Sequence, residues 1–206
     1  LDKFTECGTW VLRQLEPEVA HSVGAWILRR RWTPAPPATS GLETEIPGLG
    51  TVSNPFGLAA GFDKDGRSIA GLVRLGFGFL EVGTVTPKPQ VGNPQPRLFR
   101  YPSQRALANR MGFNNAGAEA MYQALSLPVP IPLGVNLGKN KDTPNERAIE
   151  DYKLLLERFA DRASYLVVNL SSPNTAGLRE LANAEFLQAL QEVALGFGVQ
   201  RVWVKL

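Results

Sequence analysis

Residues 133–141 have the sequence Leu-Gly-Val-Asn-Leu-Gly-Lys-Asn-Lys, and residues 165–174 have the sequence Tyr-Leu-Val-Val-Asn-Leu-Ser-Ser-Pro-Asn. In both, an apolar run of strand length is followed directly by amides, hydroxyls or lysines. Further runs of this kind lie at residues 56–60, 79–82 and 202–206. Helical patterns lie between several of the runs, at residues 65–75, 145–160 and 183–195. Strands that alternate with helices predict an α/β protein with a parallel sheet.

The pace of this alternation favours a (β/α)8 TIM barrel. Five predicted strands fall within roughly 150 residues, whereas a complete barrel takes about 250. We therefore expect about five of the eight strands in this chain, with roughly 100 residues of barrel still to follow Leu206. A doubly wound dinucleotide-binding sheet is the weaker alternative, because no G-x-G-x-x-G motif follows the first strand. The chain also starts at Leu1 and not at Met, and it stops on the strand predicted at residues 202–206, so we expect both ends to be cut from a longer protein.

Residues 1–40 differ from the barrel domain expected at residues 41–206. Helical spacing indicates a first helix through Phe4, Cys7, Trp10, Val11 and Leu15. Pro17 suits the first position of a second helix, whose apolar stripe is Val19, Val23, Trp26 and Ile27. Three arginines at 29–31 and a linker rich in Pro, Ala and Ser follow. An apolar stripe beside arginines suits a helix pair at a membrane interface. A hairpin that only packs on the barrel is the alternative.

Composition excludes several classes of function. The formal charge of +3 over 206 residues is too small to indicate nucleic-acid binding. No apolar run reaches the ~18 residues of a membrane span, so any membrane contact is expected to be peripheral. A single cysteine, Cys7, and a single histidine, His21, exclude an internal disulfide framework and a Cys-cluster or His-based metal centre. An enzyme with this composition needs other groups, or a cofactor, for its proton chemistry.

Polar residues follow each predicted strand and should meet at one rim, because barrel enzymes act at the carboxyl ends of their strands. They are Gly61-Phe62-Asp63-Lys64, Gly83-Thr84-Val85-Thr86, Asn136 with Gly138-Lys139-Asn140-Lys141, Asn169 with Ser171-Ser172-Pro173-Asn174, and Lys205. Asparagine offers donor and acceptor without charge, and lysine offers a point charge for carboxylate or phosphate. The set predicts a site for an anionic, planar, hydrogen-bonding ligand. Taken singly, the asparagines and the Ser-Ser-Pro-Asn segment are also typical of turns, and Asp63-Lys64 of a surface pair.

Five segments of the chain closely resemble, in order, the motifs of the dihydroorotate dehydrogenases: residues 59–64, 81–90, 109–114, 134–141 and 169–179. The resemblance covers nearly the whole chain and implies FMN held at the top of a (β/α)8 barrel. Carried over by motif, the residues that would line the flavin are Ala59, Ala60, Gly61, Phe62, Asp63, Thr84, Asn136, Asn169 and Lys205. Those that would hold the substrate are Lys64, Asn109, Arg110, Met111, Gly112, Phe113, Asn169 and Asn174. The expected substrate and product are dihydroorotate and orotate.

The resemblance assigns the catalytic base to Ser172, the second serine of Ser-Ser-Pro-Asn. It implies that Ser172 takes a proton from C5 of dihydroorotate, that hydride moves from C6 to flavin N5, and that a quinone reoxidises the flavin. Water exclusion and a hydrogen-bonded route through Thr175 or an ordered water would assist the serine. The soluble class of the family has a cysteine at this position. Serine here indicates the quinone-linked, membrane-associated class.

In that class two N-terminal helices form a quinone tunnel and touch the bilayer. His21 and Arg100 match positions that face the quinone headgroup, and a packed structural histidine is the alternative for His21. The expected location is the periphery of the bacterial plasma membrane, or of the mitochondrial inner membrane in a eukaryote. Two other functions remain open. One is an FMN barrel of the dihydropyrimidine or dihydrouridine type, which Ser172 and the helices disfavour. The other is a catalytically incompetent fragment, since the last barrel strands usually carry the phosphate site.

Overall fold

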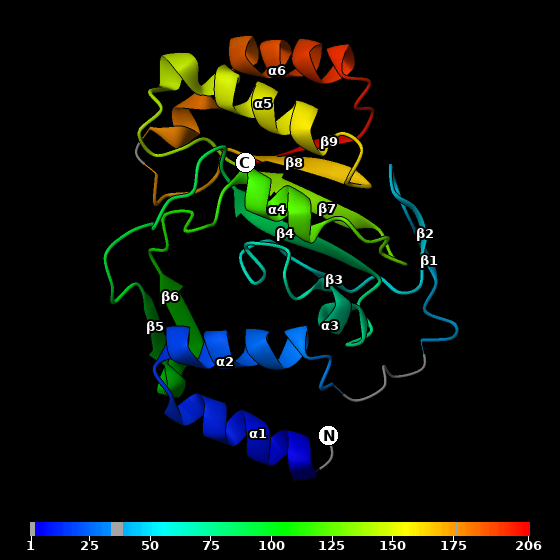
Figure 1. Ribbon diagram of the computed structural model, residues 1–206, viewed down its shortest axis with the longest axis vertical. Coiled ribbons are helices and arrows are strands. Elements are labelled where there is room, and N and C mark those ends of the chain that lie inside the picture. Colours follow the sequence, from blue (N-terminus) through cyan, green and yellow to red (C-terminus); the bar gives the residue numbers. More distant parts are fainter. Residues whose placement is uncertain (1–2, 34–38, 176) are drawn as a thin grey trace.

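The computed structural model describes residues 3–33, 39–175 and 177–206, and its centre is a parallel sheet of five strands (Figure 1). In spatial order these are β3 (Gly57–Leu58), β4 (Phe79–Val85), β7 (Leu133–Leu137), β8 (Tyr165–Asn169) and β9 (Val202–Lys205). Neighbours in the sheet are also successive parallel strands in the chain. The predicted α/β fold and the incomplete barrel of about five strands are therefore confirmed.

Helices cover the outer face of this sheet. They are α4 (Ala118–Ala124), α5 (Ala148–Phe159) and α6 (Ala184–Gly196), with short 3-10 turns η2 (Asn145–Arg147) and η3 (Leu178–Leu181) before the last two. The helices predicted at 145–160 and 183–195 are thus present. The one predicted at 65–75 shrinks to α3 (Ile69–Val73), because the Asp63 carboxylate accepts the backbone N–H groups of Arg67 and Ser68 at 3.0 and 2.7 Å and holds this stretch in a turn.

The core lies between the sheet and the outer helices. Alternate strand residues face outward, among them Leu80, Val82, Val135 and Leu137. They pack against fully buried Tyr152, Leu155, Leu156 and Phe159 of α5. The intervening residues face the barrel interior. There the Tyr165 and Trp203 rings pack together, with ring centroids 4.5 Å apart and an angle of 33° between the ring planes. Both faces of β7 and β8 are buried, and for this reason their sequences are mostly apolar.

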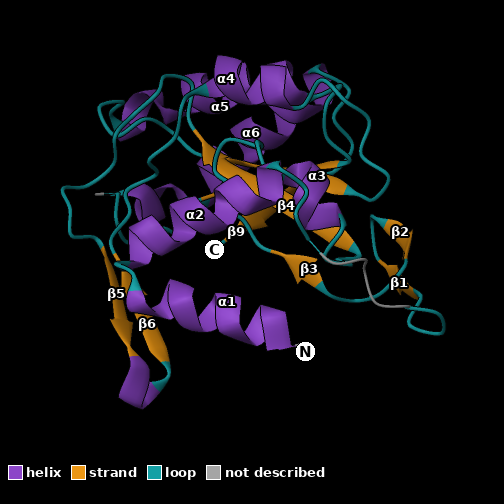
Figure 2. Cartoon of the chain, turned by 60° about the horizontal axis from the view of Figure 1, so that its bottom comes forward, coloured by secondary structure: helices purple, strands orange, loops and turns teal. Residues whose placement is uncertain are grey.

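The N-terminal helices α1 (Lys3–Gln14) and α2 (Pro17–Arg29) lie side by side below the sheet (Figures 1 and 2). Pro17 opens α2 as predicted, and the Glu16 carboxylate accepts the N–H groups of Glu18 and Val19. Through Ala25 and Leu28, α2 packs on α3, and Ser68 Oγ donates to the Ala25 carbonyl at 3.4 Å. Among the described residues, no helix has both the length and the apolarity to cross a bilayer.

Two antiparallel hairpins flank the sheet. The first joins β1 (Thr44–Ile46) to β2 (Gly50–Val52), and its turn approaches Trp203. The second joins β5 (Leu98–Tyr101) to β6 (Ala106–Asn109) through the 3-10 turn η1 (Pro102–Gln104), and it was not predicted. In both ribbon views this second hairpin stands beside the start of α2 (Figures 1 and 2).

Candidate active site

A cavity of about 620 Å³, here called the main cavity, lies at the carboxyl ends of the strands. Its walls come from the first βα segment (Leu58 to Phe62, and Lys64), Thr84, α2 (Glu18 and His21), the second hairpin (Leu98, Leu107 and Asn109), the following turn (Met111, Gly112 and Phe113), and Asn169, Ser171, Ser172, Pro173, Asn174 and Lys205. Most of the predicted site residues therefore meet around one space. Asp63, Arg100, Arg110 and Asn136 are not among its walls.

Asn136 lies directly beneath the cavity and is fully buried. Its Oδ1 accepts hydrogen bonds from Thr84 Oγ1 at 2.5 Å and from Asn169 Nδ2 at 3.1 Å. Asn169 Nδ2 also donates to Thr84 Oγ1 at 3.2 Å. The two wall residues Thr84 and Asn169 are thus held by an asparagine that does not itself reach the surface of the cavity.

Lys64 brings a positive charge to the cavity wall. Its Nζ donates to the Gly61 carbonyl at 2.6 Å. Burial lowers the pKa of Lys64, and the nearby Glu18 carboxylate opposes that effect. Asp63, one residue earlier, is buried and used by the backbone turn before α3, and burial raises its pKa. Asp63 was predicted to line the flavin and Lys64 to hold the substrate. Only Lys64 lies in the cavity wall, where it can meet a ligand.

The segment with the predicted base begins just above β8. Ser172 Oγ accepts the Asn174 backbone N–H at 3.3 Å. Ser171 donates both its N–H and its Oγ hydroxyl to Asn169 Oδ1, each at 3.2 Å, and Arg179 Nε donates to the Ser171 carbonyl at 3.1 Å. Over the part of the chain that the structure describes, no hydrogen bond joins Ser172 to Thr175, which was one of the two expected routes. Thr175 is buried.

In the segment after β6, some residues line the cavity and Arg110 does not. Phe113 adopts a left-handed backbone conformation, with φ 53°, and its ring lies in the cavity wall. Strained residues of this kind gather at functional sites. Arg110 instead donates through Nε and Nη2 to the Pro96 carbonyl, at 3.1 and 2.8 Å. Its guanidinium is thereby committed to the protein backbone, and Arg110 contributes no wall to the cavity.

The two predicted quinone residues separate as well. His21 lines the main cavity and packs edge-on against Phe62, with ring centroids 5.0 Å apart. Burial, and then the charge of Lys64, lower the pKa of His21. Arg100 Nη1 donates to the carbonyls of Arg13 and Leu15, at 2.8 and 3.1 Å, and so holds the turn between α1 and α2.

Glu18, Leu98 and Leu107 line the cavity but were not predicted to do so. A glutamate in the first turn of a helix is already explained by the helix dipole, so the sequence carried no further signal for Glu18. The two leucines belong to the unpredicted hairpin. A signal for that hairpin was available, since Pro102 and Ser103 are turn residues between two short strand-like segments.

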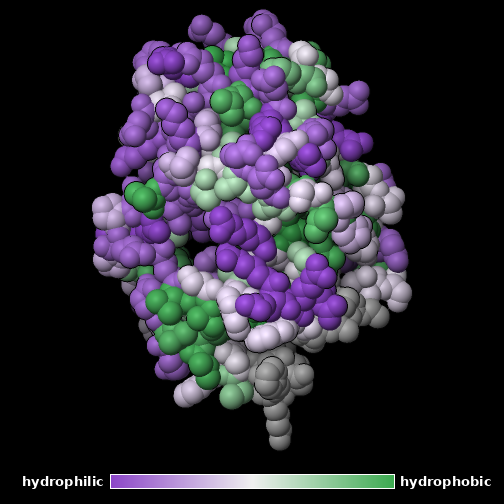
Figure 3. Space-filling model, viewed as in Figure 1, coloured by the Kyte–Doolittle hydropathy of each residue, from purple (hydrophilic) through white to green (hydrophobic). Residues whose placement is uncertain are grey.

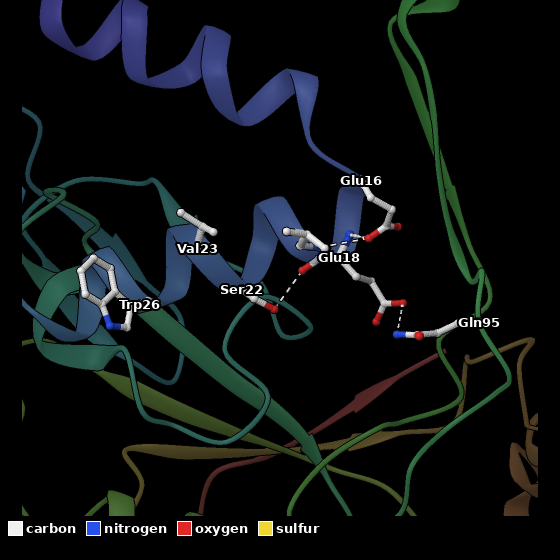
Figure 4. A pocket seen from close by; sticks show the side chains of 7 residues that line it. Glu16, Glu18, Ser22, Val23, Trp26 and Gln95 are labelled. Atoms are coloured by element: carbon white, nitrogen blue, oxygen red, sulfur yellow. Dashed lines mark hydrogen bonds between the residues drawn. The ribbon is translucent and has the colours of Figure 1, made fainter.

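A second hollow of about 440 Å³ lies along α2 (Figure 4). Its walls are Glu16, Glu18, Val19, Ser22, Val23, Trp26 and Gln95. In Figure 4 the Gln95 amide reaches Glu18, where Nε2 donates to Oε2 at 3.0 Å. Glu18 thus stands between this hollow and the main cavity and belongs to the walls of both.

Comparison with known proteins adds the following. A family model described as dihydroorotate dehydrogenase matches residues 41–206. The chain is 49% identical over 195 residues to dihydroorotate dehydrogenase (quinone) of Acidithiobacillus ferrooxidans, covering 87% of this chain and 53% of the relative. It is 49% identical over 199 residues to the protein of that name in Anaeromyxobacter sp., covering 91% and 54%. The chain therefore spans about half the length of these curated relatives.

Among solved structures, the chain is similar to DHODH from Eimeria tenella in complex with ferulenol. The TM-score is 0.82 at 40% identity, over 92% of this chain and 54% of the other.

Proposed function

The chain belongs to the dihydroorotate dehydrogenase family, and from this premise we propose that the protein oxidises dihydroorotate to orotate in pyrimidine biosynthesis, with FMN as cofactor and a quinone as electron acceptor. The observation that carries the proposal is the meeting of Lys64, Ser172 and Lys205 around a single cavity at the carboxyl ends of the strands. These three side chains are far apart in sequence, and each suits one step of that reaction.

The residues present fit the ring system of FMN. A run of small residues, Ala59 to Gly61, forms one wall, and Gly61 has φ 106° with open space where a side chain would stand. A flat ligand can therefore lie close to the backbone there. Thr84, Asn169 and Lys205 supply a hydroxyl, an amide and a positive charge. When bound, FMN would supply a two-electron acceptor for the substrate hydride, and Lys205 would favour negative charge on it.

Lys64 and three asparagines suit the substrate. The Lys64 ammonium is the charge that a carboxylate on the ligand requires, and Asn109, Asn169 and Asn174 line the same cavity. Their amides offer donors and acceptors for the ring amides of a dihydropyrimidine. Lys64 Nζ has only the Gly61 carbonyl as protein acceptor among the described residues, so two of its three protons are available to a ligand.

Ser172 is the proposed base for the C5 proton. The Asn174 N–H donates to Ser172 Oγ, and a hydrogen bond of this polarity favours the deprotonated oxygen. Ser172 lies in the wall of the cavity. Exclusion of water there by a bound ligand would strengthen the hydrogen bond from the Asn174 N–H to Ser172 Oγ. Asn174 thus serves twice in the proposal, through its backbone toward Ser172 and through its side chain toward the substrate.

The quinone is proposed to approach from the side of α2, and the protein to lie at the periphery of the plasma membrane, or of the mitochondrial inner membrane in a eukaryote. In support, Trp10, Val11, Val23, Trp26 and Trp32 of the N-terminal segment are exposed beside three arginines. Figure 3 shows apolar side chains gathered low on one face, in the region of the N-terminal helices and the second hairpin. His21 lies where α2 meets the cavity.

The test is turnover by the protein as its gene encodes it, purified with its flavin. We expect dihydroorotate to reduce a quinone or a dye, and Ser172→Ala to lower kcat by about 10² to 10⁴, the usual contribution of a positioned base. Ser126→Ala is the matched control and should retain kcat, because Ser126 lies near Leu133 and Ser164 at the amino ends of the strands and is not part of the main cavity wall. Turnover with a reduced uracil or dihydrouridine, and none with dihydroorotate, would replace this proposal by the dihydropyrimidine type of reaction.

A further inference from the structure

An acidic side chain lies inside the barrel, below the main cavity. Glu81 belongs to β4, where it faces the interior while its neighbours Leu80 and Val82 face the outer core. Its Oε1 accepts a hydrogen bond from Asn136 Nδ2 at 2.7 Å. No ion pair within 4.0 Å involves Glu81 in the described part of the chain, although the charge of Lys205 acts on it. Burial raises the pKa of Glu81, and the bond from Asn136 opposes that effect.

An interior carboxylate at this place has a geometric consequence. An ionised carboxylate accepts hydrogen bonds and cannot donate them. The amide of Asn136 must therefore turn its nitrogen toward Glu81 and its oxygen toward the cavity side. That oxygen is the atom which accepts from Thr84 Oγ1 and Asn169 Nδ2.

The orientation of Asn136 then determines that of Asn169. Because Asn136 presents an oxygen, Asn169 turns its nitrogen inward and its own oxygen outward. Asn169 Oδ1 is in turn the acceptor for the backbone N–H and the hydroxyl of Ser171. The result is a directional chain of hydrogen bonds, here called the amide relay, that runs from Ser171 through Asn169 and Asn136 to Glu81.

An asparagine amide has nearly the same shape after a 180° flip, so shape alone does not select its orientation. In the amide relay each flip would bring two donors or two acceptors face to face. The Ser171 hydroxyl can donate or accept, but the Ser171 backbone N–H can only donate, and the Glu81 carboxylate can only accept. The relay is therefore fixed from both ends, and Glu81 is the side chain that fixes it from the interior end.

We propose that Glu81 is a positioning residue, which sets the direction of the amide relay and so fixes the Asn169 amide and the start of the Ser171–Asn174 segment for the ligands of the main cavity. This rests on the proposed function for the identity of those ligands, but the relay itself does not depend on them. Glu81 contacts neither ligand in this proposal and acts through Asn136.

The test compares three variants of the protein as its gene encodes it, loaded with FMN. Glu81→Gln keeps size but can offer either a donor or an acceptor to Asn136. Glu81→Gln combined with Asn136→Asp exchanges the two roles at constant net charge, because the carboxylate introduced at position 136 can accept from Thr84, from Asn169 and from the amide introduced at position 81. Glu157→Gln, an exposed position on α5, is the control.

Two readouts separate this proposal from the proposed function. Without any substrate, hydrogen exchange at the Ser171 amide should quicken at least tenfold in Glu81→Gln, remain as in wild type in the control, and return toward wild type in the double variant. With substrate, Glu81→Gln should raise the KM for dihydroorotate and the dissociation constant of FMN about tenfold, roughly the effect of one lost hydrogen bond to a charged group.

Equal Ser171 exchange in wild type and Glu81→Gln would overturn the proposal, whether or not dihydroorotate is the substrate. If Glu81→Gln fails to fold, the double variant decides: protection of Ser171 at the wild-type level supports the relay, and its loss in a folded double variant overturns it. Absence of dihydroorotate turnover in the wild type would remove the proposed function and leave the exchange result standing.

Discussion

Arg97 and Glu18 form an ion pair with 3.0 Å between Nη2 and Oε1, and it joins the loop before β5 to the first turn of α2. The two side chains are only 10% and 17% exposed. The rest of the guanidinium is also used, since Nη1 donates to the carbonyls of Val91 and Asn93. Among the described residues, this is the ion pair that ties the N-terminal helices to the rest of the chain.

Removal of one partner should therefore be costly. Arg97→Leu leaves the Glu18 carboxylate without its counterion in a nearly buried position, and we expect the free energy of unfolding to fall by about 3–5 kcal/mol. Denaturant unfolding of the whole protein measures this. Arg147→Leu removes an exposed pair with Glu150 and is the control, for which little change is expected. Similar losses in the two variants would show that burial of the Arg97 pair has no special weight.

The close approach of α2 to α3 depends on Gly71. A Cβ at this position would lie 2.2 Å from the Leu28 carbonyl oxygen, which is backbone and cannot move alone. Gly71→Ala should therefore push α2 away from the barrel and lower stability by about 1–3 kcal/mol. Gly24→Ala within α2 has open space for its Cβ and should be neutral or stabilising, by up to about 1 kcal/mol. Thermal unfolding of both variants checks the contrast, and an equal response of the two would contradict it.

The lowered pKa of His21 predicts that the stability of the protein depends on pH. Burial and the charge of Lys64 hold its pKa in the folded protein below the usual 6.5. The unfolded chain then binds a proton more readily than the folded one as pH falls through 6.5, so this residue makes the protein less stable at lower pH. His21→Gln should show a shallower loss of stability between about pH 7 and pH 5.5. Identical slopes in the two proteins would exclude a contribution from His21.

The five-stranded sheet also predicts the behaviour of residues 1–206 expressed by themselves. β9 forms one edge of the sheet, and Val204 and Leu206 are exposed there. A parallel sheet is normally covered on both faces and closed in a barrel. Since the chain spans about half of its curated relatives, we expect this piece alone to be poorly soluble or to bind FMN weakly. Stoichiometric flavin in the purified piece would contradict this expectation.

The barrel strands could be predicted because their signal is local. Residues 133–137 and 165–169 are buried on both faces, which requires mostly apolar residues, and the polar residues at the end of each run mark the rim. Family resemblance then named the individual residues, and most of them lie at the main cavity. Their chemical roles stay predictions until turnover is measured.

The second hairpin has only its turn residues, Pro102 and Ser103, as a local signal. All four residues of β6 are exposed, so the strand itself shows no alternation of buried and exposed positions. The bonds of Arg97 to Glu18 and of Arg100 to Arg13 join segments about 80 residues apart, and no local pattern reveals such a partner. The same holds for the shortened α3, whose start depends on the side chain of Asp63.

The second hairpin has a kinetic implication. Arg100 in β5 holds the turn between the N-terminal helices, while Asn109 at the end of β6 stands opposite Leu98 and reaches the main cavity. A compound wedged between α2 and this hairpin would shift Asn109 relative to Lys64 without touching either ligand there. Inhibitors bound beside the helices should consequently show mixed, and not purely competitive, patterns against the proposed substrate dihydroorotate.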